Sequence, residues 1–124
     1  MAAVFTIDPV LGSSDVTQDE SFYTGTITLS GSYGGGATHG DTLSFANVKG
    51  LQSLRVPLKV SIYEQPPAGT APSYYAAVFC PGTTQANGVV NFSLAGTEYP
   101  EGTTYTGVLS TAVWKCRCWF PLGQ

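Results

Sequence analysis

Alternation of polar and apolar side chains at every second position is the feature of this sequence that most restricts its fold. The clearest run is at residues 24–33, where Thr24, Thr26 and Thr28 share one face and Ile27 and Leu29 share the other. No segment of useful length carries apolar residues at the 3.6-residue spacing of a helix. The sequence therefore predicts an all-β protein.

Further strands are predicted wherever the same alternation lies between clusters of Gly, Pro and Asn. These strands are residues 41–45, 58–63, 73–79, 89–94, 105–109 and 112–120. About seven or eight short strands without a helix predict a single antiparallel β-sandwich. Both a jelly roll and an immunoglobulin-like Greek key agree with these spacings, and the sequence leaves the two open.

Glycines predict two of the connections. The glycines at 34–36 separate residues 24–33 from residues 41–45, so these two strands are expected to form a hairpin with a wide loop. Asn87 and Gly88 are expected to supply the positive φ angles of a tight turn before the strand that follows them.

The C-terminal strand predicts part of the core. Trp114, Cys116, Cys118 and Phe120 alternate with a more polar set and are expected to point inward. The three cysteines of the chain cannot all pair with one another, so reduced thiols are the default expectation. A disulfide from Cys80 to one of the other two is the alternative if their strands adjoin.

The chain of 124 residues has the size of a single domain. Residues 1–21 read as an N-terminal segment and residues 22–124 as the β-sandwich domain. The segment has a brief apolar run at 4–7 followed by a polar run from 12 to 20. It predicts either a first strand with a loop or an arm that packs on a neighbouring subunit, and both remain open.

Charge is sparse in this chain. Charged residues make up 10 % of it, against about 25 % in an ordinary soluble domain, which suggests that partners cover much of the surface. The net charge is −3, and five cations cannot neutralise many phosphates of a duplex, so no nucleic-acid partner is expected. These cations are Lys49, Arg55, Lys59, Lys115 and Arg117.

No apolar run approaches the 18 residues of a membrane span, and the first residues lack the basic and apolar regions of a signal peptide. No membrane association is therefore expected, and the chain is expected to be made in the cytoplasm.

Catalytic and metal-binding groups are few. His39 is the one histidine, it lies in a glycine-flanked loop, and it is expected to be a solvated loop residue and not a general base. A zinc site would need Cys80, Cys116, Cys118 and His39, which lack the usual ligand spacing, so buried thiols are the better interpretation. The chain is expected not to be an enzyme, with no catalytic, cofactor-binding or metal residues.

Acidic residues could gather around calcium or supply the paired carboxylates of a glycosidase. The candidates are Asp15, Asp19, Glu20 and Asp41. No EF-hand-like run surrounds them, and a short chain with so little charge has little material for a cleft. Solvated acidic loops are the expected interpretation.

Aromatic residues could stack on sugars or anchor a protein partner if they are exposed. The candidates are Tyr63, Tyr74 or Tyr75, Tyr99 and Trp119. One member of each adjacent pair is expected in the core, so the sequence does not predict a sugar platform outright.

The order of motifs in this chain resembles that of a known family. The motifs are the run at 24–33, the glycine-rich tip after it, residues 40–45, Val56-Pro57 leading into 58–63, residues 82–90, and residues 101–105 before a closing apolar strand. Over residues 22–120 they resemble the small all-β head decoration, or cement, proteins of tailed bacteriophages.

This resemblance implies a structural protein on the exterior of the virion capsid, assembled in the cytoplasm of a bacterial host. It implies a homotrimer whose partner is the major capsid protein. A clip that stiffens a shell needs contact area and no active site. The alternative is a carbohydrate- or receptor-binding β-sandwich module of a tail fibre or adhesin.

Overall fold

The structure is a computed structural model that describes residues 3–8, 14–16, 20–34, 40–51, 55–100, 102–105, 109 and 111–121. For residues 14–16 and 20 it describes the backbone alone. All nine elements bounded within this part of the chain are β-strands, so the prediction of an all-β protein is confirmed.

The strands follow the alternating segments of the sequence, because alternate residues of a strand face opposite sides of a sheet. They are β1 (Ala3–Ile7), β2 (Ser14–Val16), β3 (Glu20–Leu29), β4 (Asp41–Ser44), β5 (Lys59–Glu64), β6 (Tyr75–Cys80), β7 (Val89–Leu94), β8 (Thr97–Glu98) and β9 (Trp114–Pro121).

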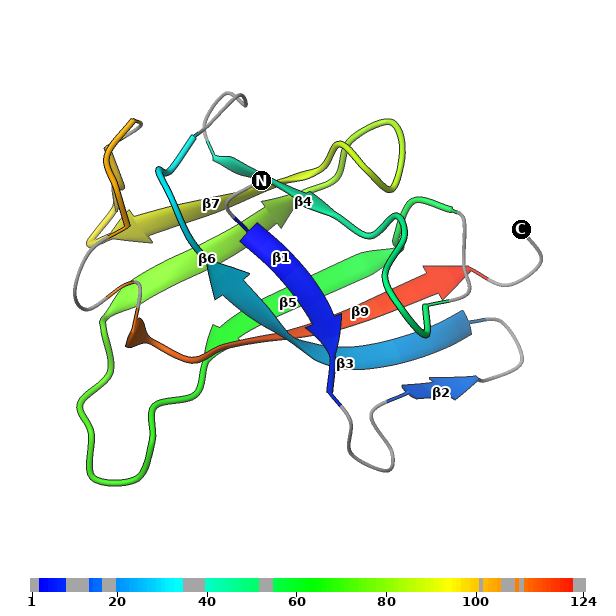
Figure 1. Cartoon of the computed structure of the whole chain (residues 1–124), viewed down its shortest axis with the longest axis horizontal. Helices are drawn as coiled ribbons and strands as arrows, with labels where there is room; N and C mark the ends of the chain where they lie inside the picture. The colour runs from blue at the N-terminus through cyan, green and yellow to red at the C-terminus, as the bar shows by residue number, and fades with distance from the viewer. Residues whose placement is uncertain are drawn as a thin grey trace.

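Seven strands form one continuous path in the order β5-β9-β3-β1-β4-β7-β6. The short strands β2 and β8 lie off this path and pair with β3 and β7. The two ends of the path, β5 and β6, lie side by side, so the sheet nearly closes on itself (Figure 1).

Aromatic rings fill the space that the bent sheet encloses. Phe92 on β7 contacts Trp114 on β9 with ring centroids 5.1 Å apart, although three strands separate β7 from β9 along the sheet. Phe45, just after β4, contacts Phe120 on β9 at 5.5 Å. Trp114, Cys116, Cys118 and Phe120 are all buried, so the predicted core face of the last strand is confirmed.

One pair of strands departs from the predicted antiparallel arrangement. β1 pairs in parallel with β4, with Ala3 opposite Leu43 and Val4 opposite Ser44. The other strand pairs in the described part of the chain are antiparallel. The description as purely antiparallel is therefore wrong at this pair.

The predicted hairpin between residues 24–33 and 41–45 is also wrong. β1 lies between β3 and β4 and pairs with both, so these two strands are not neighbours in the sheet. The physical reason is that β1 is itself amphipathic, with Ala3 and Phe5 buried, and therefore fits a central position. The wide loop expected at 35–39 lies outside the described residues.

The strand predicted at 24–33 has different bounds in the structure. β3 begins earlier, at Glu20, and ends at Leu29. Gly31 and Gly34 then adopt positive φ angles of 71° and 77°, which turn the chain out of the sheet. Tyr33, between these glycines, is fully buried.

The strand predicted at 105–109 is not formed at the two ends that the structure describes. Thr104 makes only an isolated bridge to Ser32, and neither Tyr105 nor Leu109 lies in a strand. Both side chains are nevertheless buried, because their apolar bodies complete the core under β7 and β9. Residues 106–108 lie outside the description.

The tight turn predicted at Asn87 and Gly88 is wrong in its geometry, because neither residue has a positive φ angle. The Asn87 side chain accepts a hydrogen bond from the Thr84 backbone nitrogen at 2.9 Å and so closes a wider loop. Gly88 is needed for space, since a Cβ there would lie 2.9 Å from the Phe79 ring atom Cε1.

The N-terminal segment 1–21 contributes two strands to the sheet of its own chain. β1 pairs with β3 along its whole length, and β2 pairs with β3 through residues 14–16. The predicted boundary between residues 21 and 22 therefore falls inside β3. The arm that packs on a neighbouring subunit stays a prediction.

A two-residue turn joins β7 to β8 and allows a stability prediction. Ala95 and Gly96 both have positive φ angles, 51° and 86°, as hairpin turns of this length require. Ala95→Asn should raise the free energy of unfolding by about 0.5–1 kcal/mol, because asparagine tolerates this conformation better than alanine.

Urea unfolding of the two proteins measures this difference. Asparagine at exposed Ala76, inside β6, is the matched control and should stabilise nothing, because asparagine is unfavourable in strands. An Ala95→Asn protein no more stable than the parent would contradict the assigned turn.

Candidate functional site

A buried polar cluster surrounds Asp41, the first residue of β4, which contacts Gly34 and Tyr105. The Tyr105 hydroxyl donates to Asp41 Oδ2, and the Gly34 backbone nitrogen donates to Asp41 Oδ1 at 2.8 Å. Burial, and then the hydrogen bond to Asp41, raise the pKa of Tyr105 far above its usual value. Both carboxylate oxygens of Asp41 are therefore engaged by its own chain, which argues for a structural role and against calcium or acid–base chemistry.

Tyrosines extend this cluster into the core. The Tyr33 hydroxyl donates to Glu98 Oε2 at 2.8 Å, and the Tyr99 hydroxyl donates to the Thr104 backbone oxygen at 2.9 Å. The rings of Tyr99 and Tyr105 stack with centroids 5.9 Å apart. Tyr99 is only 7 % exposed, so its interpretation as an exposed stacking ring is wrong.

The three cysteines among the candidate zinc ligands do not come together. Cys80 is exposed on β6, whereas Cys116 and Cys118 are buried on β9, which is not a neighbour of β6 in the sheet. All three are free thiols. The hydrogen bond with Cys116 and burial raise the pKa of Cys118, which keeps this thiol protonated and unreactive.

The other predicted site residues lie outside what the structure describes. These are His39 and Asp19, together with the side chains of Asp15 and Glu20. Within the described residues, no three His, Cys, Asp or Glu side chains are grouped so that they could hold a metal ion.

A glutamate–serine pair joins the end of β5 to the segment before β6. Glu64 Oε1 accepts from the Ser73 hydroxyl at 2.7 Å and from the Ser73 backbone nitrogen at 2.9 Å. The same hydroxyl oxygen accepts from the Tyr75 backbone nitrogen at 3.2 Å. Because the donor and an acceptor site of the serine are occupied, this pair fixes the closure of the sheet and is not an activated nucleophile.

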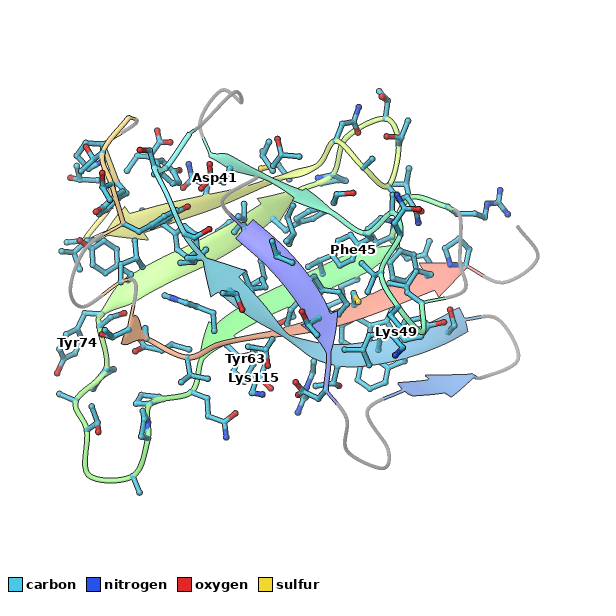
Figure 2. The ribbon with its side chains drawn as sticks, in the orientation of Figure 1. Asp41, Phe45, Lys49, Tyr63, Tyr74 and Lys115 are labelled. Atoms are coloured by element: carbon cyan, nitrogen blue, oxygen red, sulfur yellow. The ribbon has the colours of Figure 1, made fainter. Side chains whose placement is uncertain are left out.

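Tyr74, just before β6, combines exposure with backbone strain. Its side chain is 74 % exposed, and its φ angle of 66° is an outlier for a bulky residue. Figure 2 shows the ring projecting from one end of the molecule. The neighbouring Tyr75 is half-buried and contacts the Tyr99 ring, so the structure resolves which of the two tyrosines is presented to solvent.

Beside Tyr74, the outer surface of β6 and β7 carries no charge. We name this surface the neutral face and define it by Ala76, Val78, Cys80, Val89, Asn91 and Ser93. Val78 is 56 % exposed at its centre. β6 is one of the two end strands of the sheet. Uncharged residues along an end strand are typical of a surface that a partner covers.

The outer surface of β5, β9 and β3 has the opposite character. We name it the cationic face, and its residues form three rows across the strands. The rows are Lys59–Trp119–Phe22, Ser61–Arg117–Thr24 and Tyr63–Lys115–Thr26. Three of the five cations of the chain lie on this face.

Aromatic rings hold two of these cations in place. Lys59 Nζ lies 5.0 Å from the centroid of Trp119, and Arg117 Cζ lies 5.6 Å from the centroid of Tyr63. Phe22 contacts the Trp119 ring, with centroids 4.9 Å apart.

The third cation is paired within the face. Lys115 Nζ lies 3.1 Å from Asp8 Oδ2 and donates to Thr26 Oγ1 at 2.9 Å. The Thr26 hydroxyl donates in turn to Asp8 Oδ1 at 2.8 Å. This closed group leaves Lys115 little capacity for another anion, whereas Lys59 and Arg117 contact only rings among the described side chains.

Comparison of the chain with protein-family models, with curated sequences and with solved structures gave no match. In the described residues, no helix has the length and apolar character that crossing a bilayer requires. The functional assignment therefore depends on the geometry of the two faces and of Tyr74.

Part of the cationic face is predictable from the sequence, and part of it is not. The alternation on the last strand placed Lys115, Arg117 and Trp119 on one side, as the structure has them. It could not place Lys59 and Phe22 in the same row as Trp119, because rows depend on the register between strands. No signal in the sequence marks the strained backbone of Tyr74.

Proposed function

We propose that this chain is a structural protein of a virion, a head decoration or cement protein that binds the outer surface of the major capsid shell and stabilises the head. Tyr74 is the observation that carries the proposal. A tyrosine with a positive φ angle costs about 1–2 kcal/mol relative to a relaxed conformation, and an exposed ring recovers little of that cost within its own chain.

A contact with another protein explains why such a residue is present. Exposed tyrosines are frequent anchors of protein interfaces, because the ring is large, rigid and polar at its tip. The neutral face beside Tyr74 supplies uncharged area, whose desolvation costs less free energy than that of charged side chains. A standard interface needs about 800 Å² per partner, so the neutral face on two six-residue strands would form its centre and the neighbouring surface would have to complete it.

The finer architecture belongs to the same proposal. We take the nearly closed sheet as a β-sandwich, with β5, β9, β3 and β1 in one layer and β4, β7 and β6 in the other. Ring contacts between β7 and β9 across the core support two packed layers. The jelly-roll and Greek-key alternatives of the sequence both remain proposals, and either gives the rigid, non-catalytic body that a clip requires.

The alternative is a carbohydrate- or receptor-binding module, which needs aromatic rings with free faces. Of the candidate rings, Tyr99 is buried, while Lys59 covers a face of Trp119 and Arg117 covers a face of Tyr63. Tyr74 alone among them is largely exposed. One free ring favours a protein anchor over a sugar platform, for which several rings normally cooperate.

Copy number in purified particles tests the proposal. A decoration protein should be present at a stoichiometry comparable to that of the major capsid protein, and quantitative mass spectrometry of virions measures it. The proposed homotrimer predicts three times the 13.0 kDa chain mass in native mass spectrometry or on the shell. A protein that is absent from particles, or present in only a few copies, would exclude the role.

A further inference from the structure

The cationic face contains two cations that no described carboxylate neutralises. Lys59 and Arg117 each lie over an aromatic ring, whereas Lys115 is paired with Asp8. Among the described side chains of this face, three cations therefore stand against one carboxylate. The backbone register places Asp15 opposite Phe22 and Glu20 opposite Pro121, on the same side of the sheet, so what distinguishes this face is the availability of Lys59 and Arg117 and not an excess of positive charge.

These two cations are also positioned before any partner binds. Lysine and arginine side chains lose rotamer freedom when they bind a partner, and ring contacts reduce the freedom that remains to be lost. Lys59 is opposite Trp119, and Arg117 is two residues before Trp119 on the same strand. This diagonal places the two backbone positions about 7–8 Å apart, which matches alternate side chains of an extended peptide.

The rings and the number of cations restrict the chemical class of the partner. Because Lys59 and Arg117 each cover one face of Trp119 and Tyr63, these rings offer less stacking area to sugars or nucleobases. Two available cations are too few to follow a phosphate backbone. Carboxylates on a polypeptide fit better, since the neighbouring hydroxyls of Ser61 and Thr24 can bond to peptide groups.

We propose that the cationic face binds an acidic polypeptide segment, with Lys59 and Arg117 each contacting one carboxylate. This surface is distinct from the neutral face, which lies on β6 and β7, and from Tyr74, which lies just before β6. It goes beyond the capsid role and does not depend on it, because any acidic protein segment would be recognised in the same way. With both surfaces in use, one copy would bridge two partners.

An NMR titration of the isotope-labelled full chain with a capped hexaglutamate peptide tests this proposal. Saturable shifts are expected at the amides of β5 and β9 and at the arginine side chain of Arg117. Lys59→Gln with Arg117→Gln should weaken binding about tenfold, the scale expected for losing two partly exposed charge contacts. Raising the salt concentration from roughly 0.1 M to roughly 0.5 M should also weaken the binding of hexaglutamate to the parent protein.

The matched control removes the same amount of charge elsewhere. Lys49→Gln with Arg55→Gln lowers the net charge equally and should leave hexaglutamate binding within about twofold of the parent. Equal weakening by both double variants would show attraction to net charge alone and would overturn the proposal. Thermal unfolding of all three proteins identifies any variant that has lost its fold.

Three further probes decide the partner class. Capped hexaglutamine should not bind, and equal binding of this neutral peptide would show that carboxylates are not required. An oligothymidylate or an oligoglucuronate that binds the same amides more tightly than hexaglutamate would replace the polypeptide by a nucleic acid or an acidic sugar. Each of these outcomes leaves the capsid proposal untouched, since that proposal depends on Tyr74 and on copy number in virions.

Discussion

Tyr74→Asn should weaken binding to phage heads that lack this protein by at least about thirtyfold, while the free energy of unfolding rises by about 1 kcal/mol. The two effects have opposite signs because the residue is strained in the folded chain and is proposed to act only in the complex. Asparagine accepts the φ angle of 66° more readily than tyrosine but removes the exposed ring.

Binding to heads, measured by sedimentation with labelled protein, and urea unfolding give the two quantities separately. Tyr74→Phe is the matched control, since it keeps both the ring and the strain and should bind within a few-fold of the parent. Unchanged binding of Tyr74→Asn would remove the observation on which the proposed contact rests. A loss of binding accompanied by a loss of stability would show that the ring serves the fold and not the contact.

Gly25→Ala should destabilise the protein by about 3 kcal/mol, because an added methyl group at this position has no space. Gly25 lies in the middle of β3, opposite Ile7 on β1 and Cys116 on β9. A Cβ there would overlap the Thr6 backbone oxygen and the Phe5 ring. Backbone cannot rotate away as a side chain can, so β1 would have to separate from β3.

Gly31→Ala is the control that distinguishes the effect of steric crowding at Gly25 from the effect of losing a glycine's conformational freedom. Gly31 has a φ angle of 71° and no atom within 4 Å of an added Cβ, so alanine there should cost only about 1 kcal/mol. Urea unfolding of both variants measures the contrast. Equal losses at the two glycines would contradict the close approach of β1 to β3.

Tyr74 also shows how far the candidate site could be predicted. The sequence presents two adjacent tyrosines and predicts that one is exposed, but it does not say which one. Alternation shows only that Tyr74 and Tyr75 face opposite sides. Which of the two faces the core depends on the contact between the rings of Tyr75 and Tyr99. The positive φ angle of Tyr74 occurs directly after Ser73, which is hydrogen-bonded to Glu64 on a different strand, and such a long-range contact cannot be read from the local sequence.

The sequence by itself determined that this is a β protein, and it determined which side of the last strand enters the core. Both depend on the period of two along a single strand, which is a local property of the chain. The face of Trp114 and Phe120 could therefore be read without knowing what they contact.

Only the tertiary structure decided which strands are neighbours. β1 lies between β3 and β4, so the hairpin that proximity in sequence predicts is not formed. The register between β5 and β9 then brings Lys59 onto Trp119 and Arg117 beside Tyr63, which creates the cationic face. Strand order and register depend on packing between residues far apart in sequence, and alternation, which repeats identically in every strand, carries no information about either.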